Sequence, residues 1–488
     1  MRALSNLGDL IDRSRDSEKS ALIDLGGEHA PREFSYRALD ALANGFAAML
    51  EQRGLARGSR VAILSANRAD FIAACFGIMR AGFVAVPVNI KFPQRLIDYV
   101  LADSDAELVF CDGGRREHVP PRLPVVEFGG EAPSAEAFDA IRPEPQESAM
   151  FLYTSGSTGE PKGVVLSHAS HLWVVKTRLA GKDWSGQRLL VAAPLYHMNA
   201  LALAQFAAAA HATVVLLPQF TARAYIEAIE RYRCTWLTAV PPMMAMMLRE
   251  QALLERTDLS TVQFIRMGSA PVSASLMAGL RRYFPKASIV NAYGTTEAGP
   301  VVFGPHPKGL PQPELSVGYP HPEVELRLAD GVLQMKCPAL MTGYHKKPEA
   351  TRKAFTPEGY YITGDVFRRD EQGFYYFLGR TDDMFVSGGE NIYPSEVEKM
   401  LETHPAVEQA AVIAVPDEIK GAKPVAFVVL KRGRQASEEE IKHYALENAP
   451  AYQHPRRVWF MDELPLAGTN KVDRKALAQL AQKEMATS

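Results

Sequence analysis

The sequence predicts an α/β fold with a large N-terminal domain of parallel βαβ-type subdomains, a small β subdomain and an α+β C-terminal domain. Short apolar runs rich in β-branched residues alternate with helical segments in the first part of the chain. A Gly- and Pro-rich segment, residues 306–322, interrupts this rhythm, and new helix-start signals appear after residue 382. The 488 residues are 47% hydrophobic, enough to bury a core in each of about three structural units.

The βαβ rhythm is clearest early in the chain. Strands are predicted at residues 60–64, 83–88 and 108–111, because these runs are apolar and rich in β-branched side chains. Amphipathic or buried helices are predicted between them, at residues 71–79 and 96–101. Strands that alternate with helices are typical of a parallel sheet covered by helices.

Residues 189–219 contain no Asp, Glu, Lys or Arg and approach the length of a membrane span. Pro194, His197 and Asn199 interrupt the segment, and a lipid-facing helix would have to carry all of them. A strand, a loop, an Ala-rich helix and a second strand at residues 214–217 accommodate these residues better. We therefore expect no membrane span.

The middle of the chain carries the signs of a domain boundary. Residues 306–322 show little periodicity and are expected to form a long surface connection. Residues 323–328 and 332–336 follow as strands of the small β subdomain. We expect an N-terminal domain at residues 1–381 and a C-terminal domain at residues 382–488.

The C-terminal segment has its own pattern of helices and strands. Ser395 and Glu398 have the spacing of a capping box, which predicts a helix that starts at this point. Strands are predicted at residues 409–415 and 425–430, and a second capping box at residues 437–440 opens another helix. This alternation predicts a separate α+β unit with a small core of its own.

Composition excludes some functional classes. Lys and Arg total 54 against 56 Asp and Glu, so no overall positive charge is available to hold a nucleic acid. The four cysteines lie far apart and show no zinc or disulfide spacing, which favours reduced thiols. The N-terminus has no apolar signal segment, so we expect a cytoplasmic protein, and a homodimer is left open.

Residues 153–163 (YTSGSTGEPKG) contain three glycines, four Ser or Thr residues and one lysine. Glycines let backbone amides turn towards an oxyanion, hydroxyls donate further hydrogen bonds, and the lysine adds positive charge, which together suit a polyphosphate. The run is not the P-loop NTPase pattern, because five residues separate Gly156 from Lys162 and Gly163 follows the lysine. Taken alone, it is also compatible with a flexible turn.

Four further runs follow in order: residues 291–297 (NAYGTTE), 361–365 (YITGD), 379–391 (GRTDDMFVSGGEN) and 465–474 (PLAGTNKVDR). With the glycine-rich run, they resemble the signature motifs of the acyl-adenylate-forming enzymes, which include acyl-CoA synthetases, peptide-synthetase adenylation domains and beetle luciferases. The resemblance covers nearly the whole chain. It implies that a carboxylate attacks the α-phosphorus of ATP and releases pyrophosphate, and that the thiol of coenzyme A then displaces AMP.

The resemblance also implies an ATP site. Its residues are Thr154, Ser155, Gly156, Ser157, Thr158, Gly159, Lys162, Gly268, Ser269, Ala270, Asn291, Ala292, Tyr293, Gly294, Thr295, Thr296, Asp365 and Arg380. Glu297 is the implied Mg²⁺ ligand, assisted by the Thr154 hydroxyl, although such an acid after a turn is commonly just solvated. Asp365 would bind the ribose hydroxyls with help from Arg380, and Tyr293 would stack on adenine unless it belongs to the core.

The C-terminal domain is implied to be mobile and to carry two functional faces. Lys471 would enter the cleft during adenylation and neutralise charge on the carboxylate and α-phosphate, although an isolated lysine is normally surface charge. Asp382 matches the hinge of the family. After rotation, Ser387, Gly388 and Gly389 would line the pantetheine channel; the simpler alternative for the two glycines is a hairpin turn.

The acyl pocket is the least defined part of the site. The residues implied by the resemblance are His197, Met198, Asn199, Val240, Met243, Met267, Gly268, Gly294, Pro300 and Val301, with His197 beside the reacting carboxylate or else a core histidine. This lining is apolar with one amide, so a second carboxylate on the substrate is disfavoured, although Arg266 lies on the same strand. Residues 297–301 resemble 4-coumarate:CoA ligases, and Asn199 could bond a ring hydroxyl.

We therefore expect an AMP-forming carboxylic acid:CoA ligase that uses ATP, Mg²⁺ and coenzyme A. Its substrate is expected to be an aromatic acid of the hydroxycinnamate or benzoate type. A short- or medium-chain fatty or hydroxy acid ligase and a stand-alone adenylating enzyme for a carrier protein are the alternatives. A luciferase shares the fold and would be distinguished only by light emission with a luciferin, so it is a minor alternative. A catalytically dead nucleotide-binding or scaffold protein is disfavoured, since Glu297, Asp365 and Lys471 are all present.

Overall fold

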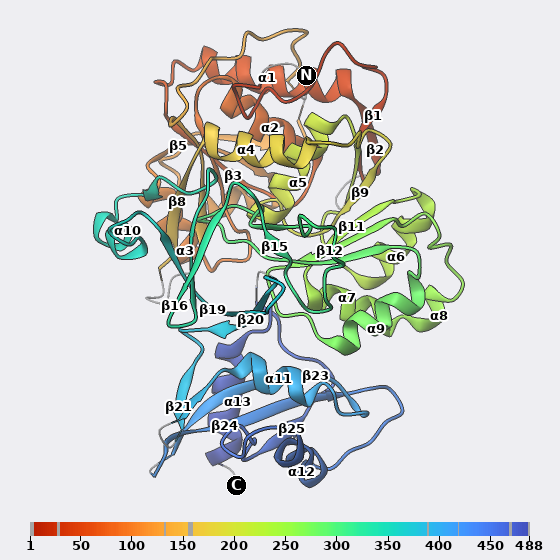
Figure 1. Ribbon diagram of the computed structural model, residues 1–488. Helices are drawn as coiled ribbons and strands as arrows, with labels where there is room; N and C mark the ends of the chain where they lie inside the picture. The colour runs from red at the N-terminus through yellow and green to blue at the C-terminus, as the bar shows by residue number, and fades with distance from the viewer. Residues whose placement is uncertain are drawn as a thin grey trace.

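The computed structural model describes residues 4–26, 30–130, 133–154, 160–387, 390–417, 419–467 and 471–486. Two seven-stranded sheets form most of the N-terminal part, and the C-terminal elements lie together at the opposite end of the molecule from α1 (Tyr36–Gln52) (Figure 1). This is the mixed α/β architecture predicted from the sequence, with parallel strands, a large N-terminal domain and a smaller C-terminal one.

The first seven-stranded sheet is parallel except at one edge. In spatial order its strands are β13 (Ser288–Ala292), β12 (Phe264–Gly268), β11 (Trp236–Ala239), β9 (Arg188–Val191), β10 (Thr213–Leu216), β1 (Ser20–Asp24) and β2 (Arg32–Ser35). Only β2 runs antiparallel to its neighbour. The helices that connect or flank these strands are α5 (Met198–Ala210), α6 (Ala222–Arg231), α7 (Pro241–Arg249), α8 (Gln251–Leu254) and α9 (Ala274–Tyr283).

The second seven-stranded sheet has a parallel centre and an antiparallel edge. Its order is β18 (Gly343–Tyr344), β8 (Lys162–Ser167), β7 (Ser148–Thr154), β4 (Val84–Pro87), β3 (Arg60–Leu64), β5 (Ala106–Asp112) and β6 (Val125–Phe128). Helices α2 (Ala69–Arg80), α3 (Gln94–Asp103) and α4 (His168–Leu179) and a 3₁₀ turn at Gly113–His118 belong to it. The early strand and helix predictions are confirmed, although β4 is one residue shorter at each end than expected.

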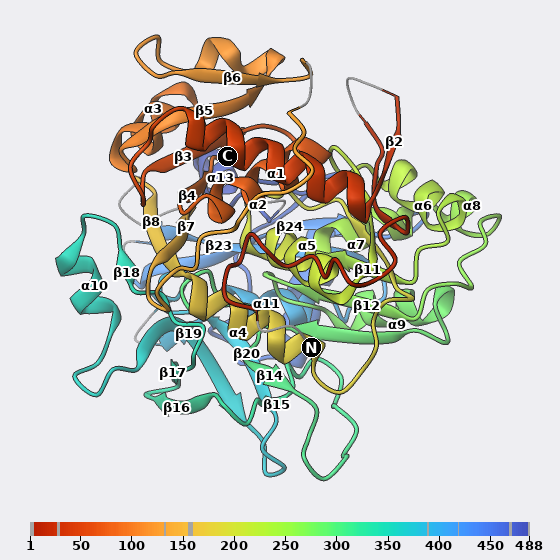
Figure 2. The ribbon, with the colours of Figure 1, turned by 90° about the horizontal axis from the view of Figure 1, so that it is seen from above.

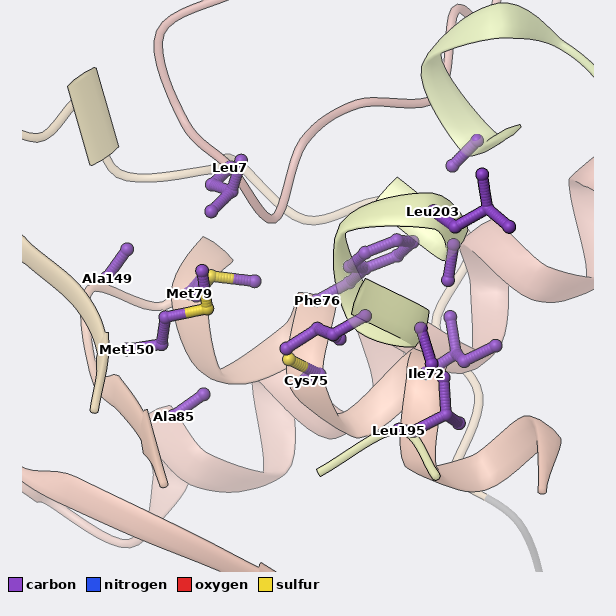
Figure 3. Packing of buried hydrophobic residues seen from close by; sticks show 14 of the residues in the cluster. Leu7, Ile72, Cys75, Phe76, Met79, Ala85, Ala149, Met150, Leu195 and Leu203 are labelled. Carbon is purple, nitrogen blue, oxygen red and sulfur yellow. The ribbon is translucent and has the colours of Figure 1, made fainter. Parts of the chain in front are cut away.

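One hydrophobic cluster joins the two sheets, and α2 lies within it. Every residue of α2 is buried, as expected for a helix that is apolar all round. Figure 3 shows Ile72 and Phe76 of this helix beside Leu195, which lies between β9 and α5, and Leu203 on α5. Seen from above, α1 and α2 lie over the region between β3 and β4 on one side and β11 and β12 on the other (Figure 2).

Residues 189–219, the uncharged run of membrane-span length, belong to β9, a loop, α5 and β10. This is the predicted order of strand, loop, helix and strand. Among the described residues, no helix combines the length and the apolar character needed to cross a bilayer. All four cysteines are free.

The small β subdomain is a four-stranded antiparallel sheet of β16 (Glu325–Ala329), β17 (Val332–Lys336), β19 (Tyr361–Arg369) and β20 (Tyr375–Arg380), with α10 (Pro348–Ala354) nearby. The connection at residues 306–322 is less superficial than predicted: Ser316 and Val317 are buried, and β15 (Tyr319–Pro320) pairs with β14 (Phe303–Gly304). The Ser316 hydroxyl donates to the carbonyl of Tyr375, which fixes the connection to β20.

The C-terminal elements pack on both faces of a three-stranded sheet. They are β21 (Phe385–Ser387), β22 (Glu390–Ile392), α11 (Pro394–Leu401), β23 (Val407–Asp417), β24 (Gly421–Leu430), α12 (Glu438–Asn448), β25 (Val458–Phe460) and α13 (Arg474–Ala486). Two hydrophobic clusters here draw only on residues after 382. The boundary between residues 381 and 382 stays a prediction.

The two predicted capping boxes had different outcomes. The box at residues 437–440 is present, and it starts α12. The box at Ser395 and Glu398 is wrong: α11 begins at Pro394, the Ser395 hydroxyl bonds the carbonyl of Leu378, and Glu398 pairs with Arg474 at 2.7 Å. Tertiary partners satisfy these side chains, so neither is available to cap the helix.

Candidate active site

A hairpin presents the first group of polar residues. Strands β7 and β8 are antiparallel, and Thr154 pairs with Lys162 across the end of the hairpin. The predicted loop residues Ser155, Gly156, Ser157, Thr158 and Gly159 lie outside the described residues. The Lys162 ammonium lies 4.5 Å from the ring centroid of Tyr344 on β18, a cation–π contact that fixes its direction.

Tyr344 connects this hairpin to the predicted metal ligand. Its hydroxyl donates to Oε1 of Glu297 at 3.0 Å. Glu297 lies in the turn after β13, where Thr295 and Gly299 form an antiparallel bridge. The turn is tight at Gly294, because a Cβ there would lie 2.6 Å from the carbonyl oxygen of Gly299. This turn therefore places the Glu297 carboxylate opposite the end of the hairpin.

Asp365 forms the centre of a second polar group. It lies on β19 and is 4% exposed, and β20 places Arg380 directly opposite it. The Arg380 Nη1 lies 3.1 Å from Oδ1 of Asp365, and the Tyr293 hydroxyl donates to the other carboxylate oxygen. Burial raises the pKa of the Asp365 carboxyl above its ordinary value, while Arg380 opposes this shift. The second nitrogen of Arg380 pairs with Asp382, the predicted hinge, at 3.3 Å.

Lys471 reaches the same region from the C-terminal domain. A small hairpin holds its backbone, since the Ala467 amide donates to the Lys471 carbonyl at 2.7 Å and Leu466 bridges to Val472. The side chain lines an open cleft and is exposed to solvent in the observed orientation. Partial desolvation by the surrounding protein lowers the pKa of its ammonium, Arg380 adds to this effect, and Asp365 opposes it.

His197 lies across the cleft from Lys471, at the N-cap position of α5. Its Nε2 is buried and has no hydrogen-bond partner in the part of the chain that the structure describes. Burial, followed in size by the charge of Lys471, lowers its pKa to about 4. His197 is therefore neutral at physiological pH, and the ring presents an unused nitrogen near the cleft.

These groups meet in a cleft of about 1940 Å³ between the two parts of the molecule. The predicted site residues that line it are Thr154, Lys162, His197, Met198, Asn199, Val240, Met243, Ser269, Ala270, Asn291, Ala292, Tyr293, Gly294, Thr295, Thr296, Glu297, Asp365, Arg380, Asp382 and Lys471. Residues that are far apart in the sequence thus converge on one space.

Several predicted residues lie elsewhere. Met267 and Val301 are buried in hydrophobic clusters, and Pro300 and Gly268 form part of the second layer behind the wall. Gly268 has a packing role, because a Cβ there would lie 2.8 Å from the Ala292 carbonyl oxygen. Ser387 is buried on β21 and does not reach the cleft in this domain orientation, and Gly388 and Gly389 lie outside the described residues.

Other residues of the cleft had no clear sequence signal. Tyr344, which contacts both Lys162 and Glu297, lies in a two-residue strand that no periodicity marks. The cleft lining contains more basic than acidic side chains, although the net charge of the chain is -2 and hides this local excess. The basic residues there include Arg249, Lys431, Arg432, Arg434 and Lys475.

Known proteins share both the sequence and the architecture. Residues 12–345 match the AMP-binding enzyme family and residues 396–471 match its C-terminal domain. A feruloyl-CoA synthase from Amycolatopsis sp is 32% identical over 95% of this chain and 96% of its own length.

Two solved structures extend this similarity to the fold. The ATP-bound MatB from Rhodopseudomonas palustris is 28% identical, with a TM-score of 0.87 and 98% of each chain covered. The anthranilate CoA ligase AuaEII in complex with anthranoyl-AMP is 26% identical, with a TM-score of 0.88 and the same coverage. The chain therefore belongs to the AMP-binding enzyme family of acyl-adenylate-forming proteins, and it is an AMP-forming acid–thiol ligase.

Proposed function

We propose that the enzyme converts an aromatic carboxylic acid, of the hydroxycinnamate or benzoate type, and ATP into an acyl adenylate, and then transfers the acyl group to coenzyme A with release of AMP. One observation carries the proposal: Lys162, Glu297, Asp365 and Lys471, which come from four separate motifs, line the same cleft. The names of the feruloyl and anthranilate ligases among the similar proteins support an aromatic substrate.

The phosphate end of ATP is assigned to the hairpin of β7 and β8. Lys162 supplies positive charge, and Thr154 supplies a hydroxyl at the same end of the hairpin. Charge supplied here stabilises the leaving pyrophosphate, because an oriented cation in a cleft needs no reorganisation during the reaction. Tyr344 holds both side chains in place, because its ring contacts the Lys162 ammonium and its hydroxyl donates to Glu297.

The residues present fit a magnesium ion. Mg²⁺ is usually held by one or two carboxylates together with substrate phosphates and water, rather than by a full cage of protein ligands. No cluster of three or more His, Cys, Asp or Glu side chains occurs among the residues that the structure describes, and Glu297 with the Thr154 hydroxyl supplies oxygen atoms of the right kind. When bound, the ion would neutralise charge on the phosphate oxygens.

The nucleoside is assigned to Asp365, Arg380 and the turn after β13. The Asp365 carboxylate already accepts a hydrogen bond from Tyr293 and pairs with Arg380. It can also accept hydrogen bonds from the two ribose hydroxyls. Ser269 and Ala270 follow β12 at the adenine end, and Ser269 has a φ of 67°, a strained value for a residue with a side chain. This backbone shape would direct its amide and carbonyl groups towards the base.

The two half-reactions are assigned to two orientations of the C-terminal domain. In the orientation observed, Lys471 faces Asp365 and Glu297, so its ammonium is placed to neutralise charge on the attacking carboxylate and the α-phosphate. Rotation about Asp382 would then bring Ser387, Gly388 and Gly389 to the cleft for thioester formation. The excess of basic side chains in the cleft lining would attract the phosphates of coenzyme A.

The first experiment measures AMP release that depends on coenzyme A, with ATP and Mg²⁺, across benzoates, hydroxycinnamates, C3 to C10 fatty acids and hydroxy acids. A response confined to aromatic acids supports the proposed substrate class. A response confined to fatty or hydroxy acids contradicts it while the ligase activity stands. Pyrophosphate release without thioester would identify an adenylating enzyme that serves a carrier protein.

A further inference from the structure

We propose that the acyl pocket ends in a subsite for a second oxyanion, formed by Arg178 and Arg266. The substrate would then be an acid that carries a carboxylate or sulfonate at the end remote from the reacting carboxyl. The proposal rests on the function proposed above and specifies the substrate class of the same site.

Arg266 lies directly behind the wall of the cleft. Its neighbours Ile265 and Met267 on β12 are buried in one hydrophobic cluster, so Arg266 extends from the opposite face of the sheet. Its Nη2 donates to the Pro300 carbonyl at 2.8 Å. Pro300 in turn packs on the cleft-lining Gly294, where an added Cβ would lie 2.7 Å from the Pro300 Cα.

Arg178 approaches from the helix above this face. It lies in the last turn of α4, and its Nη1 donates to the Ala202 carbonyl on α5 at 3.4 Å. Met198 and Asn199, one turn earlier on α5, line the cleft. The two guanidinium groups are close enough for the charge of Arg266 to lower the pKa of Arg178, an effect second only to burial.

Neither arginine has an acidic partner. Among the described residues, no carboxylate lies within ion-pair distance of Arg178 or Arg266, and no carboxylate affects the pKa of either group. Burial alone lowers the pKa of Arg266 to about 10. Two neighbouring, partly buried cations without an anion are costly, because their desolvation is not compensated by an opposite charge. An anionic ligand between them would supply that compensation.

Other polar groups near the two arginines are also unsatisfied. Gln205 is fully buried on α5, and neither its side-chain oxygen nor its nitrogen has a hydrogen-bond partner in the structure as described. It lies three residues after Ala202, so both occupy the same face of the helix. The Thr238 hydroxyl is buried without a partner, and Thr238 is the register neighbour of Arg266 on β11. These groups would give a bound oxyanion further donors.

The position of the arginines sets the size of the substrate. Ala202 lies three residues beyond Asn199, about 4.5 Å further along α5 at 1.5 Å per residue. The second oxyanion would therefore lie about 4.5 Å, a little less than one helical turn, beyond the cleft-lining Asn199. That separation suits a benzene ring or a chain of about four carbons between the two acidic groups. A subsite of this kind would pair the second carboxylate that was expected from the sequence to go unpaired. The sequence could not show this, because nothing in it indicates that Arg178 lies near Arg266.

The decisive experiment compares acids that differ only in their remote group. The pairs are terephthalate with 4-methylbenzoate, 4-carboxycinnamate with 4-methylcinnamate, and adipate with hexanoate; 4-sulfobenzoate distinguishes a sulfonate from a carboxylate. We expect kcat/KM for acid-dependent AMP formation to be at least about tenfold higher for the dianionic member, the discrimination given by a buried charged contact. Equal or higher values for every methyl-terminated partner would overturn the subsite.

Variants connect the preference to the two residues. Arg266→Met and Arg178→Met remove charge at similar length, so each should reverse the preference within a pair. Arg188→Met is the matched control, since Arg188 lies in the same sheet and also donates to a carbonyl, that of Tyr232. In the absence of ligand, the two test variants should melt no lower than the wild type, because they remove uncompensated charge. Reversed preference in the control variant alone would contradict the assignment.

Calorimetry of the wild type with terephthalate, and with adipate, tests the subsite without catalysis. Binding that Arg266→Met abolishes supports it, and no binding of either dicarboxylate at millimolar concentration overturns it. This separates the two proposals. An enzyme that forms AMP with methyl-terminated acids and ignores both substitutions keeps its proposed function and loses the subsite. A protein that binds dicarboxylates but forms no AMP with any acid keeps the subsite and loses the function.

Discussion

Lys471 and His197 approach the cleft from opposite parts of the chain, and the charge of Lys471 affects the protonation of His197. The ammonium helps to hold the pKa of His197 at about 4, so the ring is neutral when Lys471 is charged. Of these two residues, Lys471 is therefore the one that supplies positive charge. Because desolvation in the cleft lowers the pKa of Lys471, its ammonium loses its proton more easily than a fully solvated lysine would, and its charge depends on the environment that the cleft provides.

Lys471→Ala should abolish adenylation while it leaves thioester formation from a supplied acyl adenylate largely intact. A charge aimed at the developing transition state is worth a rate factor of about 10² to 10³. The two half-reactions are measured separately, by pyrophosphate exchange and by consumption of acyl-AMP with coenzyme A. Lys442→Ala, at a lysine of α12 that pairs with Glu439 and does not line the cleft, is the control and should change neither rate by more than a few-fold. Equal loss of both half-reactions would contradict the assigned role.

At the scale of elements, α11 and β23 contribute contacts between the C-terminal domain and the N-terminal part. Glu402 directly follows α11, accepts from the Ala410 amide at 3.2 Å and bonds the Ser273 hydroxyl of the N-terminal part. Burial raises the pKa of its carboxyl to about 8, and the neighbouring Glu398 acts in the same direction. The observed orientation therefore favours the protonated form of Glu402.

The adenylating orientation should weaken as the pH rises. Where Glu402 is exposed, its pKa returns to about 4.5, so the observed orientation binds the extra proton between pH 4.5 and 8 and loses up to about 1.4 kcal/mol of preference per pH unit in that window. Glu402→Gln mimics the neutral form. The ratio of its pyrophosphate exchange rate to that of the wild type should increase several-fold between pH 6 and pH 8, and a constant ratio would rule out this dependence.

The junction between β20 and β21 gives a second test at this scale. Asp382→Pro fixes φ at the predicted hinge, and within the described part of the chain the Asp382 amide donates no backbone hydrogen bond that the proline would remove. We expect thioester formation to fall at least about tenfold more than adenylation, because only the second step needs the rotation. Asp382→Ala removes the contact with Arg380 and keeps the rotation, so both steps should persist. A uniform loss in the proline variant would argue against a hinge here.

Sequence alone predicted elements whose signal is local and failed where distant partners decide. The strand at residues 60–64 and the helix that contains residues 71–79 were found from apolar periodicity, and the capping box of α12 from its spacing. The box at Ser395 failed because Leu378 and Arg474, both remote in sequence, take its side chains.

The same division applies to the candidate site. Residues within ordered motifs, such as Glu297 and Asp365, could be assigned before the fold was known, since neighbours in the motif identify them. Tyr344, Arg178 and Gln205 could not, because each enters the site or its surroundings from a separate element. The sequence also does not show which face of β12 meets the cleft. Met267 was therefore expected in the acyl pocket, whereas the structure places it in a hydrophobic core.

At the scale of the whole molecule, few polar contacts join the two parts across the cleft. Arg249 at the end of α7 pairs with Glu408 at 2.6 Å and also donates to the Asp462 carbonyl at 3.4 Å. Lys399 donates to the Phe377 carbonyl at 2.7 Å. Contacts of this kind hold one orientation without a large apolar interface, so the C-terminal domain can leave it at modest cost.

Reversal of the Arg249–Glu408 pair tests this contact. Arg249→Glu or Glu408→Arg alone should slow pyrophosphate exchange, because each brings like charges together in the observed orientation. The double substitution should recover most of the loss, with a coupling energy on the order of 1 kcal/mol for a partly exposed pair. Thioester formation from a supplied adenylate should be unchanged or faster in the single variants. Simple addition of the two single effects would show that the pair does not hold the orientation.

The four rings of Trp184, Phe206, Trp236 and Phe264 pack together on the face of the sheet that also carries Arg266. Trp236 is only two residues from Thr238, whereas Trp459 lies in the C-terminal domain against Phe427. The protein thus contains natural fluorophores beside the deep end of the proposed acyl pocket and another far from it. Quenching or a spectral shift that depends on Trp236, measured with a Trp459→Phe background, would report filling of the pocket by an unlabelled acid in real time.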